Sequence, residues 1–186
     1  DGYRAAEIAI VTTQLERGNI DDARAYLERL LDESPDDPAL RFLLATIEAA
    51  DGDLEAAEAG FRGLIEDGAG GERVWLELIR TLNQAGKAEE ARDALEAGLT
   101  AIPEAADLMW MRATFLERQH DYDAAIDIYE ELYARNTATS VIANNLASLL
   151  STQREDAESL DRAARIARRL RGTEFPPYQD TYGWIQ

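Results

Sequence analysis

The chain has 186 residues, 37 of them acidic and 19 basic, which gives a net charge near −18. This acidity argues against nucleic acid as a partner, because phosphates bind Lys and Arg, and against docking on anionic membrane surfaces. There is no cysteine, which excludes disulfides and thiolate metal sites, and no apolar run approaches the roughly 18–20 residues of a membrane span. The acidic residues are spread along the chain. They therefore favour solubility over steering of a basic partner, although steering stays open.

A fixed period of 34 residues organises the sequence. Small residues recur at this spacing: Ala23, Ala57, Ala91 and Ala125. Five residues before each lies a residue expected to end a helix: Gly18, Gly52, Gly86 or His120. A period between 20 and 50 residues indicates a stacked-repeat protein. We therefore expect repeats at about 4–37, 38–71, 72–105, 106–139 and 140–175, with a partial sixth at 176–186, forming a single array.

Each repeat is predicted to contain two helices joined by a tight turn. The unit at 72–105 shows this best, because its apolar residues fall at i, i+3, i+4 and i+7: Trp75, Leu78, Ile79 and Leu82. Gly86 supplies the left-handed conformation that a helix end commonly needs. Pro103 closes the unit, since proline cannot continue a helix. Period-2 runs typical of strands do not occur.

The fifth unit departs from the period. The segment Asn144–Leu150 matches a first helix, but a matching second helix resumes only at Leu160. This predicts an insertion of about four residues around Thr152–Ser159, which a loop tolerates at low cost. The segment Asp180–Trp184 resembles the start of a sixth first helix. Because this unit is incomplete and the chain begins at Asp1, we expect a fragment or processed form of a longer protein.

The pattern resembles the tetratricopeptide repeat (TPR) family. In the third unit the resemblance is carried by Trp75, Leu78, Gly86, Ala91 and Pro103. In the second it is carried by Leu44, Ala45, Gly52, Ala57, Phe61 and Leu64, and in the fourth by Met109, Ala113, Asp121, Tyr122, Ala125 and Tyr129. The resemblance implies an all-α fold, a right-handed α-solenoid of antiparallel helix pairs.

The resemblance also implies a function. In this family the first helices line a concave groove that binds a segment of a protein or peptide partner. The residues of this sequence at inward positions are Phe42, Arg73, Leu76, Arg80, Asn83, Trp110, Arg118, Asn144 and Ser148. Trp and Arg are enriched at interface hot spots, and the arginines suit an anionic stretch of peptide. The alternatives are ion pairs with Glu77 or Asp107 for the arginines, and packing between repeats for Trp110.

A second candidate surface is basic. It consists of Arg162, Arg165, Arg168 and Arg169, followed by Arg171, on the last complete helix. Favourable placement at a helix C-terminus, with ion pairs to acidic neighbours, explains such a cluster first. A docking patch for an acidic partner is the alternative.

The sequence contains no recognisable catalytic or metal-binding motif. The single histidine, His120, cannot form a histidine metal site or a proton relay by itself. Acidic clusters such as Asp51-Gly52-Asp53 and Asp121-Tyr122-Asp123 lack the spacing of a calcium loop and suit helix capping. We expect no enzyme activity and no cofactor or metal.

A structural role is the alternative function. The apolar residues Tyr182 and Trp184 near the end of the chain suggest self-association through the array ends. The chain would then be a spacer or assembly module of a larger bacterial envelope or polysaccharide-export protein. The compartment stays open, with a periplasmic or envelope-associated location favoured over the cytoplasm.

Overall fold

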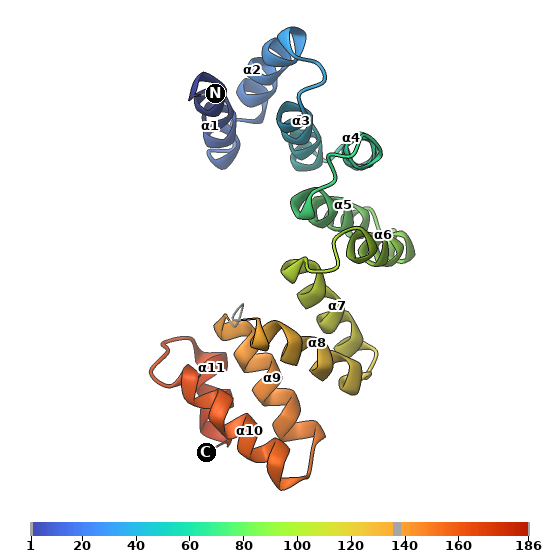
Figure 1. Ribbon diagram of the computed structural model, residues 1–186. Coiled ribbons are helices and arrows are strands. Elements are labelled where there is room, and N and C mark those ends of the chain that lie inside the picture. Colours follow the sequence, from blue (N-terminus) through green and yellow to red (C-terminus); the bar gives the residue numbers. More distant parts are fainter. Residues whose placement is uncertain (1, 136–138, 186) are drawn as a thin grey trace. The chain divides into compact units, whose positions relative to one another are not determined.

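The computed structural model describes residues 2–135 and 139–185, and this part of the chain is helical with no strand. The predicted all-α fold class is therefore confirmed. Five helix pairs follow one another (Figure 1): α1 Gly2–Glu16 with α2 Ile20–Glu33, α3 Pro38–Asp51 with α4 Leu54–Glu66, α5 Glu72–Gln84 with α6 Ala88–Ala101, α7 Ala106–Arg118 with α8 Tyr122–Ala134, and α9 Ser140–Gln153 with α10 Ala157–Ala167. A short 3₁₀ turn, η1 Arg168–Leu170, leads to α11 Pro176–Ile185.

The helices form two compact units, Asp1–Pro103 (unit 1) and Glu104–Gln186 (unit 2). Within each unit, helices pack on their neighbours in sequence. In unit 1, α3 packs on both α4 and α2, and α5 packs on α4 and α6. In unit 2, α9 packs on α8, α10 and α11. This is the packing of stacked helical repeats, in which each helix contacts only those close to it in the chain.

Small residues let the paired helices approach closely. The periodic alanines are buried in both units: Ala23, Ala57, Ala91 and Ala125. In the second pair, a Cβ atom added to Gly60 of α4 would lie only 2.8 Å from the Cβ of Ala45 on α3. Large apolar side chains such as Phe61 and Leu78 in unit 1, and Tyr129 in unit 2, fill the remaining core. A larger residue at the crossing would overpack this contact.

The turns between paired helices have the predicted chemistry. Gly18, Gly52 and Gly86 have φ angles of +76°, +90° and +75°, and His120 takes the same left-handed conformation with φ +63°. Asp53 and Asp121 cap the following helices by accepting hydrogen bonds from the backbone N–H of Ala56 and Ala124. The interpretation of these acidic clusters as capping residues is thus confirmed at both positions.

The fifth pair corrects the expected insertion. The turn between α9 and α10 spans only residues 154–156, as short as the turn at 17–19, and α10 begins at Ala157 instead of Leu160. There is thus no lengthened loop around Thr152–Ser159. Ala163 is buried at the position where α8, 34 residues earlier, has the buried Tyr129. The buried alanine of α10 therefore lies about one helical turn later in its repeat than Ala125 does in α8. When the repeats are aligned on their alanines, this later position looks like an insertion in the sequence.

Candidate partner-binding surface

In unit 1, the structure brings Phe42 and Arg73 together across two first helices, α3 and α5. The guanidinium carbon of Arg73 lies 5.0 Å from the centroid of the Phe42 ring. That ring also packs against Phe61 of α4, with 5.8 Å between centroids. The cation–π contact holds the Arg73 side chain over an aromatic face, where it remains partly exposed.

The other predicted residues of unit 1 lie on α5. Arg80 forms an ion pair with Glu77, with Nη1–Oε distances of 2.9 and 3.1 Å. This is the alternative that the sequence left open, and it offsets the positive charge of Arg80 locally. Asn83 donates a hydrogen bond from its amide to the carbonyl of Ile79 at 2.9 Å, while Leu76 is half-buried. The face therefore offers less free positive charge than the sequence suggests.

In unit 2, Trp110 borders an apolar cavity between α7 and α9. The cavity has a volume of about 460 Å³ and is lined by Ala106, Asp107, Trp110, Thr139, Val141 and Ile142. The Trp110 side chain is 37% exposed, whereas the neighbouring Met109 is buried. An exposed indole beside an apolar cavity can receive an apolar side chain of a partner.

A buried polar network lies beneath this face. The Tyr129 hydroxyl of α8 donates to Glu117 of α7 at 2.6 Å and accepts from the amide of Asn145 on α9 at 3.0 Å. Burial, followed by the hydrogen bond to Glu117, raises the pKa of Tyr129 to about 12. Asn144 donates to Asn145 at 3.3 Å, and its own Oδ1 is buried without a hydrogen-bond partner among the residues described. The network fixes three helices relative to one another.

Ser148 and Arg118 lie at two further places in unit 2. Ser148 borders a second cavity, between α9 and α11, which also contains Trp184. Arg118 lies in the last turn of α7 and forms no ion pair with any residue in the described ranges. The sequence analysis did not assign Trp184 to this face. If the segment Asp180–Trp184 is aligned with Asn144–Ser148, Trp184 occupies the position equivalent to Ser148. This alignment would have assigned Trp184 to the predicted surface.

The basic surface on α10 and η1 divides into two groups. Arg162 forms an ion pair with Glu130 of α8, with an Nε–Oε1 distance of 2.5 Å and a second contact to Oε2, and this bonding raises the pKa of Arg162. Arg162 and Arg169 both lie over the ring of Tyr133, at 5.8 and 5.2 Å. Arg165 and Arg168 are exposed and have no ion pair within the described part of the chain.

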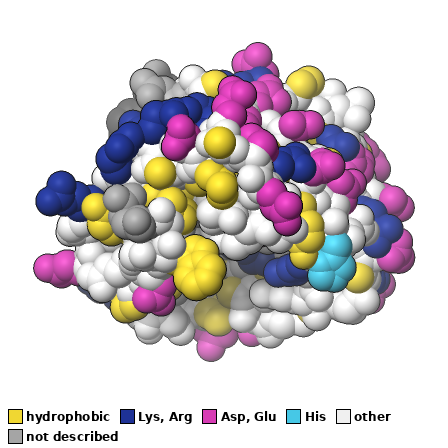
Figure 2. Space-filling view, turned by 90° about the horizontal axis from the view of Figure 1, so that it is seen from below, with side chains coloured by type: hydrophobic (Ala, Val, Ile, Leu, Met, Phe, Trp, Pro, Cys, Tyr) yellow, Lys and Arg dark blue, Asp and Glu magenta, His cyan; other side chains and the backbone are white. Residues whose placement is uncertain are grey.

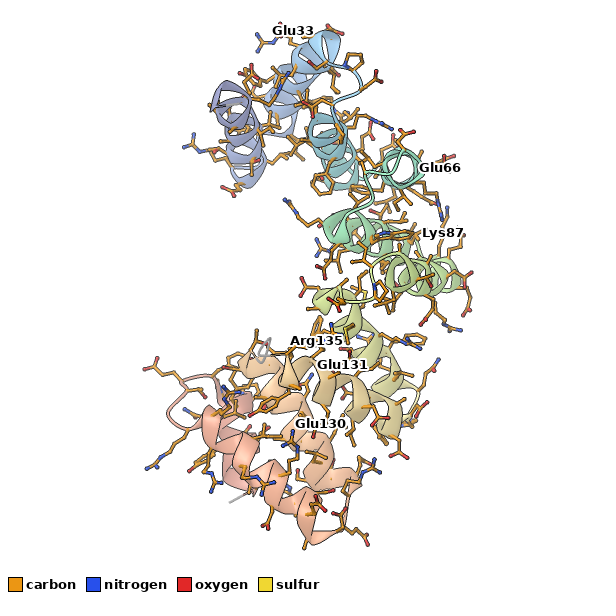
Figure 3. The ribbon with its side chains drawn as sticks, viewed as in Figure 1. Glu33, Glu66, Lys87, Glu130, Glu131 and Arg135 are labelled. Carbon is orange, nitrogen blue, oxygen red and sulfur yellow. The ribbon has the colours of Figure 1, made fainter. Side chains whose placement is uncertain are left out.

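Ion pairs also form elsewhere on the surface, both between helices and along single helices. Figure 3 labels Glu130 and Glu131 on α8 with Arg135, which pairs with Glu131 at 2.5 Å. Lys87, before α6, contacts Glu58 of α4 at 2.7 Å, and this bond together with one from Arg62 lowers the pKa of Glu58. The Lys87–Glu58 pair thus joins the start of α6 to α4, whereas the Arg135–Glu131 pair lies along a single helix.

Residues 2–135 and 139–185 contain no group of three His, Asp or Glu side chains placed to hold a metal ion. In the same residues, every helix is too short or too polar to cross a membrane.

The tetratricopeptide repeat model matches residues 8–72 and 76–140, which is most of the chain. The chain belongs to the tetratricopeptide repeat family. No curated protein matches it.

Solved TPR-like structures share the fold. The Pseudomonas aeruginosa pilF structure covers 100% of this chain and 89% of its own length, with 20% identity and a TM-score of 0.65. TTC0263, a TPR protein of Thermus thermophilus, covers 97% of both chains at 18% identity and a TM-score of 0.61. A human IFIT1 dimer with PPP-AAAA matches 96% of this chain and 46% of that one, at 21% identity and a TM-score of 0.70. The TPR fold is that of a protein-interaction scaffold.

Proposed function

We propose that the first-helix face of this TPR protein binds a segment of a partner protein, with Trp110 as an anchor. The observation that carries the proposal is the exposed Trp110 indole beside the apolar cavity of 460 Å³ between α7 and α9. Ile142 and Val141 supply the opposite wall of this cavity. Apolar burial against a large aromatic side chain supplies most of the affinity at typical interfaces.

Polar groups around this anchor would orient the partner segment. Arg118 has no ion pair within the described residues and can pair with a carboxylate, whereas the charge of Arg80 is already met by Glu77. Of the predicted arginines, Arg118 is therefore the better candidate for an acidic residue of the partner. Unit 1 has a cationic group of its own, since Arg73 is held over the ring of Phe42.

The experiment compares three immobilised chains: wild type, Trp110→Ala, and a control, Leu160→Ala. Leu160 is 40% exposed on a second helix of the same unit. Its replacement tests whether proteins bind nonspecifically to exposed apolar side chains. We expect at least one protein from the source lysate to bind wild type and control but not Trp110→Ala. Titration with that purified protein should then show a loss of affinity of about 30-fold, equivalent to about 2 kcal/mol. Equal retention by all three chains would exclude the α7–α9 cavity as the binding surface.

The structural alternative rests on a different observation. Phe175, between η1 and α11, is 54% exposed and packs edge-on against Tyr178, with 4.8 Å between ring centroids. If the chain acts as an assembly module through such residues, sedimentation velocity will show mass increasing with concentration, and Phe175→Ala will abolish the increase. A constant monomer mass up to high concentration would contradict this second proposal.

A further inference from the structure

The cavity between α9 and α11 has a different chemistry from the Trp110 cavity. Its volume is about 710 Å³. One wall carries hydroxyl groups from α9: Ser148, Ser151 and Thr152. The other wall carries polar, acidic and aromatic groups from α11: Gln179, Asp180, Thr181, Gly183 and Trp184. A Cβ atom added to Gly183 would meet nothing within 4 Å, so the space beside the indole is open.

Three hydroxyl groups of this cavity, those of Ser151, Thr152 and Thr181, already donate a hydrogen bond within their own helices. Ser151 and Thr152 both donate to the backbone carbonyl of Ser148, at 2.9 and 2.8 Å. Thr181 donates to the carbonyl of Pro177 at 3.1 Å. A hydroxyl that donates within its own helix retains only acceptor capacity toward a ligand. These three hydroxyl groups therefore present acceptor lone pairs to a ligand.

The α11 wall adds a negative charge and an open aromatic face. Asp180 and Trp184 are four residues apart on one helix and so share a face. Trp184 is 79% exposed, more than Trp110 at 37%. Asp180 is exposed and forms no ion pair with residues that the structure describes. A carboxylate, acceptor oxygens and an indole face together suit a group that is cationic and can only donate hydrogen bonds.

We propose that the α9–α11 cavity binds the cationic side chain of a lysine or arginine in a partner polypeptide, with Trp184 on its face and Asp180 as its counter-ion. This rests on the proposed function, since both cavities border the same helix, α9. An apolar side chain would offer no hydrogen-bond donor to Asp180 and the hydroxyl acceptors, and the Asp180 carboxylate would repel an anion. The net charge of −18 raises the local concentration of a basic partner. Basic side chains are scattered among acidic ones on the face in Figure 2, where an exposed hydrophobic ring is also visible.

The test uses the three indole N–H signals in nuclear magnetic resonance spectra of the whole chain, assigned through single Trp→Phe variants. The probe is the peptide acetyl-Gly-Gly-Lys-Gly-Gly-amide at 150 mM salt, and its control is the same peptide with Nε-acetyl-lysine. We expect the Trp184 signal to shift saturably with the lysine peptide, at a Kd on the order of 10 mM, as a single cation–π contact and one exposed ion pair allow. The buried Trp75 should not respond, and its unchanged signal reports that each variant remains folded.

Two matched variants separate the cavity from the general acidity of the chain. Asp180→Asn should raise the Kd of the lysine peptide at least threefold. Asp161 is an exposed aspartate on α10, and Asp161→Asn should leave this Kd unchanged. A Trp184 signal that ignores the lysine peptide, moves equally with the acetylated peptide, or is unaffected by Asp180→Asn would overturn the proposal. Partner capture through Trp110 can fail or succeed independently, because the peptide titration needs no partner protein.

Discussion

The hydroxyl of Tyr129 donates a hydrogen bond to the carboxylate of Glu117 over 2.6 Å, and the tyrosine that makes it is fully buried. Asn145 donates to the same hydroxyl from a third helix. One oxygen atom thus joins α7, α8 and α9, and two of these helices border the Trp110 cavity. The stability of this part of unit 2 should depend on it.

Replacing Tyr129 by phenylalanine tests this dependence. The variant leaves the amide of Asn145 and the carboxylate of Glu117 without their shared partner, so the free energy of unfolding should fall by about 1–3 kcal/mol. Urea denaturation followed by circular dichroism measures the change. Tyr122→Phe is the control, because its hydroxyl bonds His120 at an exposed site and water can replace it. Equal losses in both variants would contradict a special role for Tyr129.

The same tyrosine predicts a loss of stability at alkaline pH. Its pKa is raised to about 12 in the folded chain, while an unfolded tyrosine titrates near pH 10. Between these values the unfolded state has lost the proton and the folded state retains it. The stabilisation is therefore complete below pH 10 and is lost as the pH rises toward 12, by about 2–3 kcal/mol in all. The stability difference between wild type and Tyr129→Phe should shrink over this range; a constant difference would refute the shifted pKa.

Two glycines of α4 should respond oppositely to alanine. Gly60→Ala places a methyl group 2.8 Å from the Cβ of Ala45, so α3 and α4 must separate. We expect a loss of about 1–3 kcal/mol from overpacking. Gly63→Ala meets only the flexible end of Arg41, at 3.2 Å, and should gain up to about 1 kcal/mol from helix propensity. The melting temperatures of both variants test these two expectations. If Gly60→Ala raised the melting temperature, the contact between α3 and α4 would be looser than the structure shows.

His120 should be replaceable by glycine with a gain in stability. It adopts φ +63°, a conformation that costs a residue with a side chain about 1–2 kcal/mol. The exposed contact of its ring with Tyr122 offsets part of that cost. His120→Gly should therefore raise the free energy of unfolding by about 0.5–1 kcal/mol. Gln119→Gly, at a position with φ −87°, should lower it, and a melting temperature for His120→Gly below that of wild type would contradict this account.

The fold was predictable because the period depends on local chemistry. Glycines and His120 end helices by their own conformations, and alanines such as Ala57 mark where backbones cross. The register of α10 was not predictable in this way, since Ala163 substitutes for a large residue and its effect depends on packing against α9. When the repeats are aligned only on their alanines, the later position of Ala163 is mistaken for inserted residues.

The candidate surface was less predictable than the fold. The sequence placed Trp110 among the groove residues, but whether Arg80 is free depends on the rotamer that joins it to Glu77. The Tyr129 network joins three helices through side-chain ends, which no spacing in the sequence encodes. Which of the predicted residues bind a partner remains a prediction that the Trp110 and Trp184 experiments address.

The packing of each helix on its sequence neighbours has a consequence for synthesis on the ribosome. Contacts such as those of α3 with α4, or α5 with α6, close only short loops, and chains dominated by such contacts fold quickly. Domains generally fold as they emerge, beginning with the N-terminal part. Unit 1 can therefore complete its core around Phe61 and Leu78 while the residues of unit 2 are still being added. The nascent chain then exposes few unburied apolar side chains at any one time.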